Sequence, residues 1–174
     1  NVTELDLELF AVSDRNAVAA IRNGIFANSI DYWQMSDFES DLAETLWKGK
    51  ATVQMEVNRE MLTRLPMKDA LKGRAPGLYV VSARVPGSDP YDRPAAIQWF
   101  VLSDLGVATL KGADGVHVMV RALSNAEAKK GAKVTLLSRS NAVLGQTETD
   151  AEGHALFEAG LARGLGAASP ALVM

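Results

Sequence analysis

The feature that most constrains the fold is a succession of short strand-like segments after residue 105. Each segment is rich in apolar residues and is followed by Gly, Asn, Asp or Ser, which are typical of turns. Such regular spacing predicts an antiparallel β-sandwich rather than β-α-β units. The segments are residues 115–123, 132–139, 144–149, 154–159 and 171–174.

The first part of the chain combines strands with helical segments. Alternating apolar and polar residues predict a strand over 1–12, and further strands are predicted over 77–87 and 95–104. Residues 44–57 predict two strands or one strand bent at Gly49. Residues 25–40 show no clear pattern, and the stretch "DYWQMSDF" at 31–38 within them fits either a strand or an aromatic loop.

Two helical segments are expected between these strands. Ser13 or Asp14 can cap a short helix that ends before Gly24. A second helical stretch is predicted from Asn58 to Leu65, with a break at Pro66 and a further turn reaching Gly73.

The pattern of strands changes near Asp104, and we place a domain boundary there. The chain is therefore predicted to be mainly β, with two tandem antiparallel β-sandwich domains of immunoglobulin or fibronectin-III type. The first, residues 1–103, carries short helical insertions, and the second covers residues 104–174. The latter domain is short for a sandwich and ends on the apolar stretch "PALVM", so we expect it to be truncated at its C-terminus.

Composition excludes several functional classes. The net charge is −3 and the 18 Lys and Arg residues are scattered, which argues against nucleic acid as a partner. There is no cysteine, so thiol nucleophiles, disulfides and iron–sulfur clusters are excluded within this chain. No apolar run reaches the ~18–20 residues of a membrane span.

One cluster of titratable residues resembles a metal or acid–base site. Glu148, Asp150, Glu152 and His154 fall within seven positions. A calcium loop needs a downstream bidentate carboxylate, and the next acid, Glu158, lies inside an apolar strand. Zinc needs three or four ligands, and the only other histidine belongs to a different strand. The stretch from Asp150 to Gly153 is therefore predicted to be a hairpin turn.

No other motif predicts catalysis or cofactor binding. His117 alternates with valines and is expected to be solvated or bonded to a neighbour. The glycine-rich stretch 160–169 lacks the Lys-Ser/Thr of a phosphate-binding loop. Trp33, Trp47 and Trp99 are predicted to be core residues. We therefore predict no catalytic, cofactor-binding or metal-binding residue, no cofactor and no enzymatic activity.

Several longer stretches resemble the bacterial alpha-2-macroglobulin family. The most specific are "QWFVLSDLG" at 98–106, "GADGVHVMVRAL" at 112–123 and "TDAEGHALFEAGLARG" at 149–164. Looser similarity is found in "ELDLELFAV" at 4–12 and "LWKGKATVQMEVNRE" at 46–60. The resemblance implies two successive macroglobulin-like domains from the N-terminal region of such a protein.

The resemblance also implies a function for the whole protein. Members trap proteases in the periplasm, are often lipid-anchored, and are often associated with a penicillin-binding protein. A bait segment is cleaved, the molecule rearranges, and a thioester between Cys and Gln side chains can capture the attacking protease. This chain has no cysteine, so it is expected to be scaffold that contacts neighbouring domains and carries neither bait nor thioester.

A different class of function remains open. Similar sandwiches serve as adhesion or carbohydrate-binding modules of the cell envelope. That alternative predicts an exposed aromatic platform or a calcium-binding loop, and the sequence indicates neither clearly.

Overall fold

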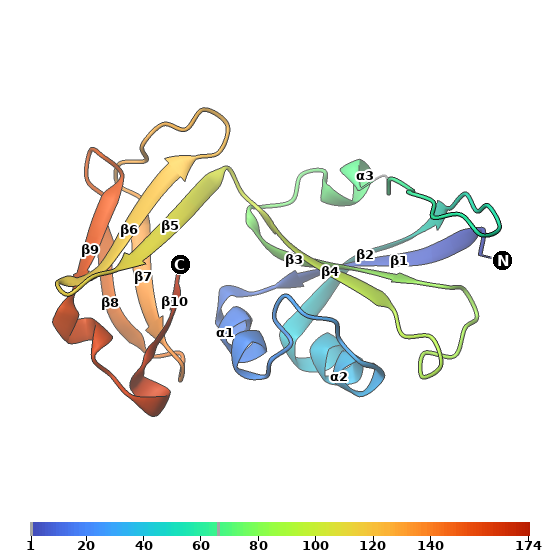
Figure 1. Cartoon of the computed structure of the whole chain (residues 1–174), viewed down its shortest axis with the longest axis horizontal. Helices are drawn as coiled ribbons and strands as arrows, with labels where there is room; N and C mark the ends of the chain where they lie inside the picture. The colour runs from blue at the N-terminus through green and yellow to red at the C-terminus, as the bar shows by residue number, and fades with distance from the viewer. Residues whose placement is uncertain (1, 66) are drawn as a thin grey trace. The chain divides into compact units, whose positions relative to one another are not determined.

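The computed structural model describes residues 2–65 and 67–174. The chain forms two compact units, one extending to Leu102 and the other from Ser103 to Met174 (Figure 1). All paired strands are antiparallel and helices are few, so the prediction of a mainly β, antiparallel fold is confirmed. No helix among the described residues has the length and apolarity needed to cross a membrane.

The first unit is built on one four-stranded sheet in the order β2-β1-β3-β4. Its strands are β1 (Glu4–Val12), β2 (Ala43–Thr52), β3 (Gly77–Arg84) and β4 (Ala96–Leu102). The stretch 44–57 thus contributes a single strand, which ends at Thr52. Opposite charges face each other across β1 and β2, where Lys48 Nζ lies 2.6 Å from Glu8 Oε1.

Helices cover one face of this sheet. They are α1 (Asp14–Arg22), α2 (Tyr32–Asp37) and the π-helical turn η1 (Phe38–Leu42). The predicted cap of α1 is confirmed, because the side chain of Ser13 accepts a hydrogen bond from the amide of Asn16. The core between helices and sheet contains Phe10, Val12, Ala20, Ile25, Ile30, Met35, Phe38, Leu42, Val80 and Trp99.

The interpretation of residues 31–38 as a strand or an aromatic loop was wrong, because they form α2 and begin η1. Asp31 Oδ1 accepts from the amide of Gln34 at 2.8 Å, and Gln34 Oε1 accepts from the amide of Asp31 at 3.2 Å. This reciprocal capping box satisfies two amides that the first helical turn leaves free, and it starts α2. Met35 and Phe38, three positions apart, then face the core.

A shorter helix, α3 (Lys68–Leu71), lies on the opposite face, where Ala70 packs in a cluster with Leu9 and Tyr79. The predicted turn before Gly73 is thereby confirmed, whereas the predicted helix over 58–65 was wrong. Asn58 adopts a positive φ of 59°, and the side chain of Leu62 is 90% exposed. Pro66 lies outside the described residues. The stretch 58–65 buries no apolar face, and packing of such a face is what stabilises short helices.

The first unit therefore differs from the expected sandwich with helical insertions. The layer packed against the large apolar face of its sheet consists of α1, α2 and η1, and the figure shows α3 on the other side (Figure 1). The reason is that Ile25, Ile30, Met35 and Phe38 supply the apolar surface that a second sheet would otherwise provide.

The second unit is a sandwich of two three-stranded sheets, as predicted. One sheet has the order β5 (Leu105–Lys111), β6 (Gly115–Ala122), β9 (His154–Glu158). The other has the order β10 (Pro170–Val173), β7 (Lys133–Ser138), β8 (Val143–Glu148). Two 3₁₀ turns, η2 (Ala159–Ala162) and η3 (Gly166–Ala168), connect β9 to β10. Strand β5 was not among the predicted segments, because six of its seven residues are exposed and give no alternating signal.

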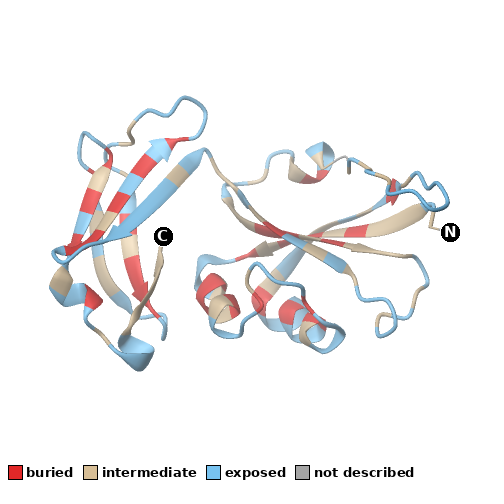
Figure 2. Ribbon diagram, viewed as in Figure 1, coloured by how far each residue is buried: buried red, intermediate tan, exposed pale blue. Residues whose placement is uncertain are grey.

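From Val116 onward, burial alternates strictly along the central strand β6 (Figure 2). Val116, Val118 and Val120 point into the sandwich and share a buried cluster with Leu136 of the facing sheet, and Ala122 is buried as well. Because side chains alternate with a period of two, the residues between them face outward. This places His117, Met119 and Arg121 on the outer surface of the sheet.

Candidate functional site

The two histidines of the chain lie together on the outer face of the second unit. Strand β6 pairs with β9 so that His117 is opposite Leu156 and Met119 is opposite His154. His117 and His154 are therefore diagonal neighbours on one face. Nδ1 of His117 lies 3.0 Å from Nε2 of His154. The expectation that a different strand would keep the two histidines from sharing a site was wrong, because β6 and β9 are adjacent.

A carboxylate lies at each end of this pair. Both oxygens of Asp114 are 3.0 Å from Nε2 of His117, and Oδ2 of Asp150 is 3.8 Å from Nδ1 of His154. The hydrogen bond from His117 holds the pKa of Asp114 below its ordinary value of 3.8. Because the ionised Asp114 only accepts, a neutral His117 carries its proton on Nε2 and accepts at Nδ1 from His154 Nε2. Asp114, His117 and His154 are thus linked by hydrogen bonds, whereas Asp150 at 3.8 Å is too far from His154 to share a proton.

The predicted hairpin turn from Asp150 to Gly153 is confirmed. Asp150 Oδ1 accepts from the amides of Glu152 at 3.0 Å and His154 at 2.8 Å. The amide of Gly153 donates to the carbonyl of Asp150, and Gly153 has a φ of 74°. The Asp150 carboxylate is therefore used to organise the turn, as Asx turns generally require.

The histidine pair has limited chemical capacity. Among the residues that the structure describes, no group of three or more His, Asp or Glu side chains is arranged to hold a metal ion. Within the same part of the chain, the histidine nitrogens bond to each other and to Asp114, and no hydroxyl group is paired with them. Activation of a serine or threonine nucleophile needs such a pairing. The arrangement can share and orient protons along the sheet surface.

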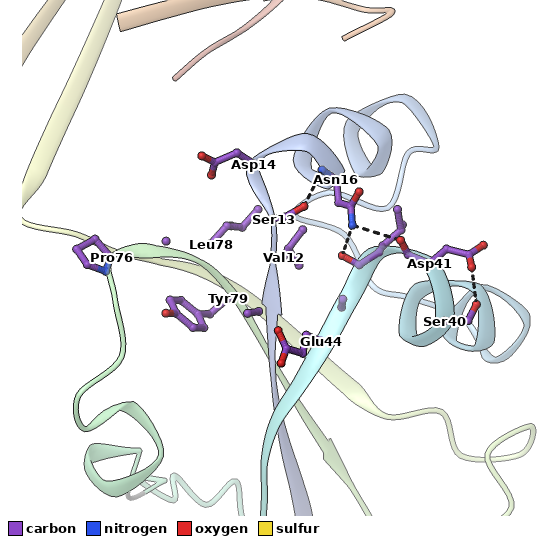
Figure 3. Close-up of a pocket in the computed structure, with 14 residues that line it drawn as sticks. Val12, Ser13, Asp14, Asn16, Ser40, Asp41, Glu44, Pro76, Leu78 and Tyr79 are labelled. Carbon is purple, nitrogen blue, oxygen red and sulfur yellow. Dashed lines mark hydrogen bonds between the residues drawn. The ribbon is translucent and has the colours of Figure 1, made fainter. Parts of the chain in front are cut away.

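A cleft of about 490 Å³ opens at one end of the sheet in the first unit (Figure 3). Asn16 holds α1 against the end of η1 there, because its Nδ2 donates to the carbonyls of Asp41 at 3.2 Å and Leu42 at 3.0 Å. Both histidines belong to the second unit, so Ser13 and Ser40 in this cleft have no histidine base in the unit. The carboxylates of Asp14, Asp41 and Glu44 make the cleft acidic but supply no nucleophile–base set.

The three tryptophans, all predicted to be core residues, differ in their environment. Trp99 is buried, and its Nε1 donates to the carbonyl of Asn28 at 3.2 Å. Trp47 packs against the cluster around Leu9. The prediction was wrong for Trp33, which is 71% exposed. Trp33 lies on the first turn of α2, two positions before the buried Met35, and therefore faces away from the core.

Two family models match the chain one after the other. The model for the bacterial alpha-2 macroglobulin MG2 domain matches residues 1–100. The model for the bacterial alpha-2-macroglobulin MG3 domain matches residues 102–174. The two matched ranges correspond closely to the two compact units of the structure.

Curated relatives show the same relationship. Alpha-2-macroglobulin of Escherichia coli (strain K12) is 28% identical over 158 residues, which cover 91% of this chain and 9% of the relative. Alpha-2-macroglobulin of Xylella fastidiosa (strain 9a5c) is 25% identical over 163 residues, which cover 90% of this chain and 10% of the relative. The chain therefore spans about a tenth of the length of these relatives.

Solved structures of the Escherichia coli protein are similar in fold. A crystal structure of the native protein spanning domains NIE-MG1 has a TM-score of 0.74 at 27% identity, covering 91% of this chain and 74% of that chain. A crystal structure of the trypsin-activated protein has a TM-score of 0.72 at 28% identity, covering 91% of this chain and 11% of that chain. With two successive domain models that together span nearly all of its residues, the chain belongs to the bacterial alpha-2-macroglobulin family.

Proposed function

We propose that this chain is a scaffold section of a larger protein that traps proteases. The observation that carries the proposal is the succession of two alpha-2-macroglobulin domain models along one chain. Each unit has its own apolar core, with Phe10 and Phe38 fully buried in the first and Val118 and Phe157 in the second. Such well-packed cores resist deformation, which suits domains that hold other parts of a protein at fixed positions.

Two further facts support a scaffold role. The chain resembles native structures of one relative with TM-scores of 0.63, 0.65 and 0.74, and a trypsin-activated structure of that relative with a TM-score of 0.72, which lies within the same range. A scaffold that keeps its fold when the trap is activated would give this result. In addition, the absence of cysteine means that a thioester cannot form within this chain. The reactive chemistry of a trap would have to be supplied by other parts of the protein.

The proposal is tested with trypsin and two substrates, one a large protein and the other a short chromogenic peptide. A trapped protease is hidden from the large substrate but still cleaves the small one. We expect the isolated chain to leave both rates unchanged and to form no covalent adduct on a denaturing gel. The full-length protein that contains the chain should suppress only cleavage of the large substrate. Suppression by the isolated chain would contradict a purely structural role.

The full-length protein can also show whether these two units are needed. Replacing Phe10 and Phe38 together by alanine removes two rings that pack edge-to-face at 5.5 Å in the first core. Each replacement should cost about 3–5 kcal/mol of folding stability. We expect the full-length variant to lose protection against large substrates, while an exposed change such as Leu62→Ala leaves protection intact. Unaltered trapping by the core variant would argue against the scaffold role.

We further propose that the chain has no enzymatic activity and acts in the periplasm, where it is held next to neighbouring domains of the same protein. The family resemblance supports this location, and it also supports a lipid anchor outside the chain and association with a penicillin-binding protein. Fractionation of cells that produce the full-length protein tests the location. We expect release by osmotic shock or recovery with the inner membrane, and recovery in the cytoplasm would contradict it.

A further inference from the structure

Three aromatic side chains gather on the surface of the first unit. Tyr32 and Trp33 begin α2, and Tyr91 comes from the loop between β3 and β4. Their exposures are 43% for Tyr32, 71% for Trp33 and 68% for Tyr91. Large aromatic rings left in water forgo the stabilisation that burial would give them. A cluster of three such rings is therefore a feature for which core packing gives no explanation.

The rings are held in defined orientations. Tyr32 is the central ring, with its centroid 5.1 Å from that of Trp33 and 6.4 Å from that of Tyr91. Both contacts are edge-to-face, with interplanar angles of 69° and 85°. The capping box between Asp31 and Gln34 fixes the helical turn that carries the first two rings. The backbone that carries Tyr32 and Trp33 is thus fixed before any ligand arrives, which reduces the entropic cost of binding.

A cleft of about 370 Å³ adjoins these rings. Tyr32, Trp33, Met35, Ser36, Glu39, Arg84 and Pro90 form its walls. The volume falls within the range of small-molecule sites, and the walls combine apolar faces with a few polar groups. Glu39 is supplied by the π-helical turn η1, an element that is rare in proteins and frequent at functional sites.

Arg84 lines this cleft and carries an unused hydrogen-bond donor. Its Nε is shielded from solvent and bonds to no acceptor among the residues that the structure describes. Buried donors without a partner are rare and costly. A ligand oxygen would offset this cost once the Arg84 side chain turns its Nε toward the cleft. The Glu39 carboxylate in the same cleft can accept from a ligand donor.

We propose that this cleft binds an uncharged carbohydrate, with a pyranose ring lying against the exposed face of Trp33. One face of a pyranose presents C–H groups that pack on an aromatic ring, while its edge carries hydroxyl groups that both donate and accept. Arg84 donates to the hydroxyl oxygens, and Glu39 accepts from the hydroxyl protons. The charges of Arg84 and Glu39 cancel, so the cleft favours a neutral sugar over a charged one.

A peptide fits this surface less well. An extended peptide binds by adding to an unpaired strand edge. Among the described residues of the wall, only Arg84 comes from a strand, and that strand, β3, is paired on both sides, with β1 and with β4. A docking helix needs a continuous apolar groove, whereas Ser36, Glu39 and Arg84 interrupt the apolar wall. The combination of stacking faces and isolated polar groups is what a sugar requires.

Binding is tested by two-dimensional NMR of the indole N–H groups in the intact chain. Cellohexaose, maltohexaose and chitohexaose are each titrated to about 10 mM, which detects affinities near the millimolar range. We expect at least one of them to shift the Trp33 signal saturably. The signals of Trp47 and Trp99 serve as internal controls, because neither residue lines the cleft.

Three variants establish where the sugar binds. Trp33→Ala and Arg84→Met should each weaken the affinity about tenfold or more, since truncated aromatic and arginine anchors typically have effects of this size. Because Trp33 is largely exposed, Trp33→Ala leaves the core intact, and its folding is checked from the unchanged signals of the other tryptophans. Leu62→Ala, at an exposed position outside the cleft, should bind as the unaltered chain does.

Three results would overturn the proposal. The first is that none of the sugars shifts the Trp33 signal. The second is that Trp33→Ala binds them as tightly as the unaltered chain. The third is that decaproline, a probe for peptide binding, shifts the Trp33 signal while the sugars do not. The scaffold role does not depend on this cleft, so failure here leaves the trapping experiments unaffected.

Discussion

His117 Nδ1 and His154 Nε2 lie 3.0 Å apart, although 37 positions separate the two residues in the chain. The ring centroids are 5.2 Å apart and the rings are inclined by only 27°, so the two nitrogens face each other almost in the ring planes. One nitrogen must donate and the other must accept. Asp114 decides which does so, because its carboxylate accepts from the far nitrogen of His117.

This geometry predicts the tautomer of both histidines. We expect each neutral ring to carry its proton on Nε2, with His117 bonded to Asp114 and His154 bonded to His117. Long-range ¹H–¹⁵N correlation spectra at mildly alkaline pH distinguish the two tautomers. In an Asp114→Asn variant the preference at His117 should weaken, since the anionic acceptor is gone. A proton found on Nδ1 of His117 in the unaltered chain would contradict the hydrogen-bond chain.

The lowered pKa of Asp114 predicts a small dependence of stability on acid pH. Its cause is the hydrogen bond from His117, which favours the ionised carboxylate in the folded state. The stabilising contribution is therefore complete above the ordinary pKa of 3.8 and is lost as the pH falls through the lower folded value. We expect Asp114→Asn to flatten the acid branch of a plot of thermal midpoint against pH.

Asp92→Asn is the control for this experiment, because Asp92 is an exposed carboxylate in a loop of the first unit. Its replacement should leave the acid branch unchanged. Identical curves for Asp114→Asn and the unaltered chain would show that the bond to His117 does not favour the ionised form in solution.

Two glycines in the second unit allow backbone strain to be separated from steric overlap. Gly131 and Gly153 have φ values of 72° and 74°. A Cβ added at Gly131 would have nothing within 4 Å, whereas one at Gly153 would lie 2.5 Å from the carbonyl oxygen of Val120. Gly131→Ala should cost about 1–2 kcal/mol through the positive φ alone. Gly153→Ala should cost about 1–3 kcal/mol more, because the backbone of β6 must move.

Hydrogen exchange of the β6 amides measures both costs in the intact chain. Equal losses of protection in the two variants would contradict the contribution of steric overlap. Equal losses would also show that the turn can shift away from Val120 without cost.

From the structure of the acidic hairpin, we predict that calcium does not change the thermal stability of the chain. Asp150 Oδ1 accepts from two backbone amides, so this oxygen is engaged in the turn and directed away from a cation site. We expect the thermal midpoints of both units to be the same in calcium and in a chelator. A site occupied at 100 times its dissociation constant would add ~2.7 kcal/mol, which thermal unfolding detects readily. A calcium-dependent rise would show that the hairpin binds the ion.

Local features of this protein were determined by the sequence. The turn from Asp150 to Gly153 follows from one side chain that bonds the backbone ahead of it and one residue that accepts positive φ. The helix after Ser13 follows from its cap, and the orientation of the β6 valines follows from strict alternation. Each of these features depends on groups within a few residues of one another. A short stretch of sequence is therefore sufficient to predict each feature.

Short helices were predicted less well, because their stability comes from packing. The capping box of Asp31 and Gln34 was a signal that could have identified α2, but a helix of six residues also needs an apolar surface to cover. Met35 packs against the apolar core on the sheet and is buried. Leu62 is exposed and does not pack against an apolar surface. The stretch from Asn58 to Leu65 therefore forms no helix.

Only the tertiary structure decided which distant side chains meet. Pairing of β6 with β9 brings His117 to His154, and the loop after β3 brings Tyr91 to Tyr32. The exposure of Trp33 was fixed in the same way, by the direction in which α2 packs on its sheet. Strand register and helix packing depend on the combined burial of many residues from separate segments. This combined burial is reached only when the whole chain folds. No local stretch of sequence can therefore predict it.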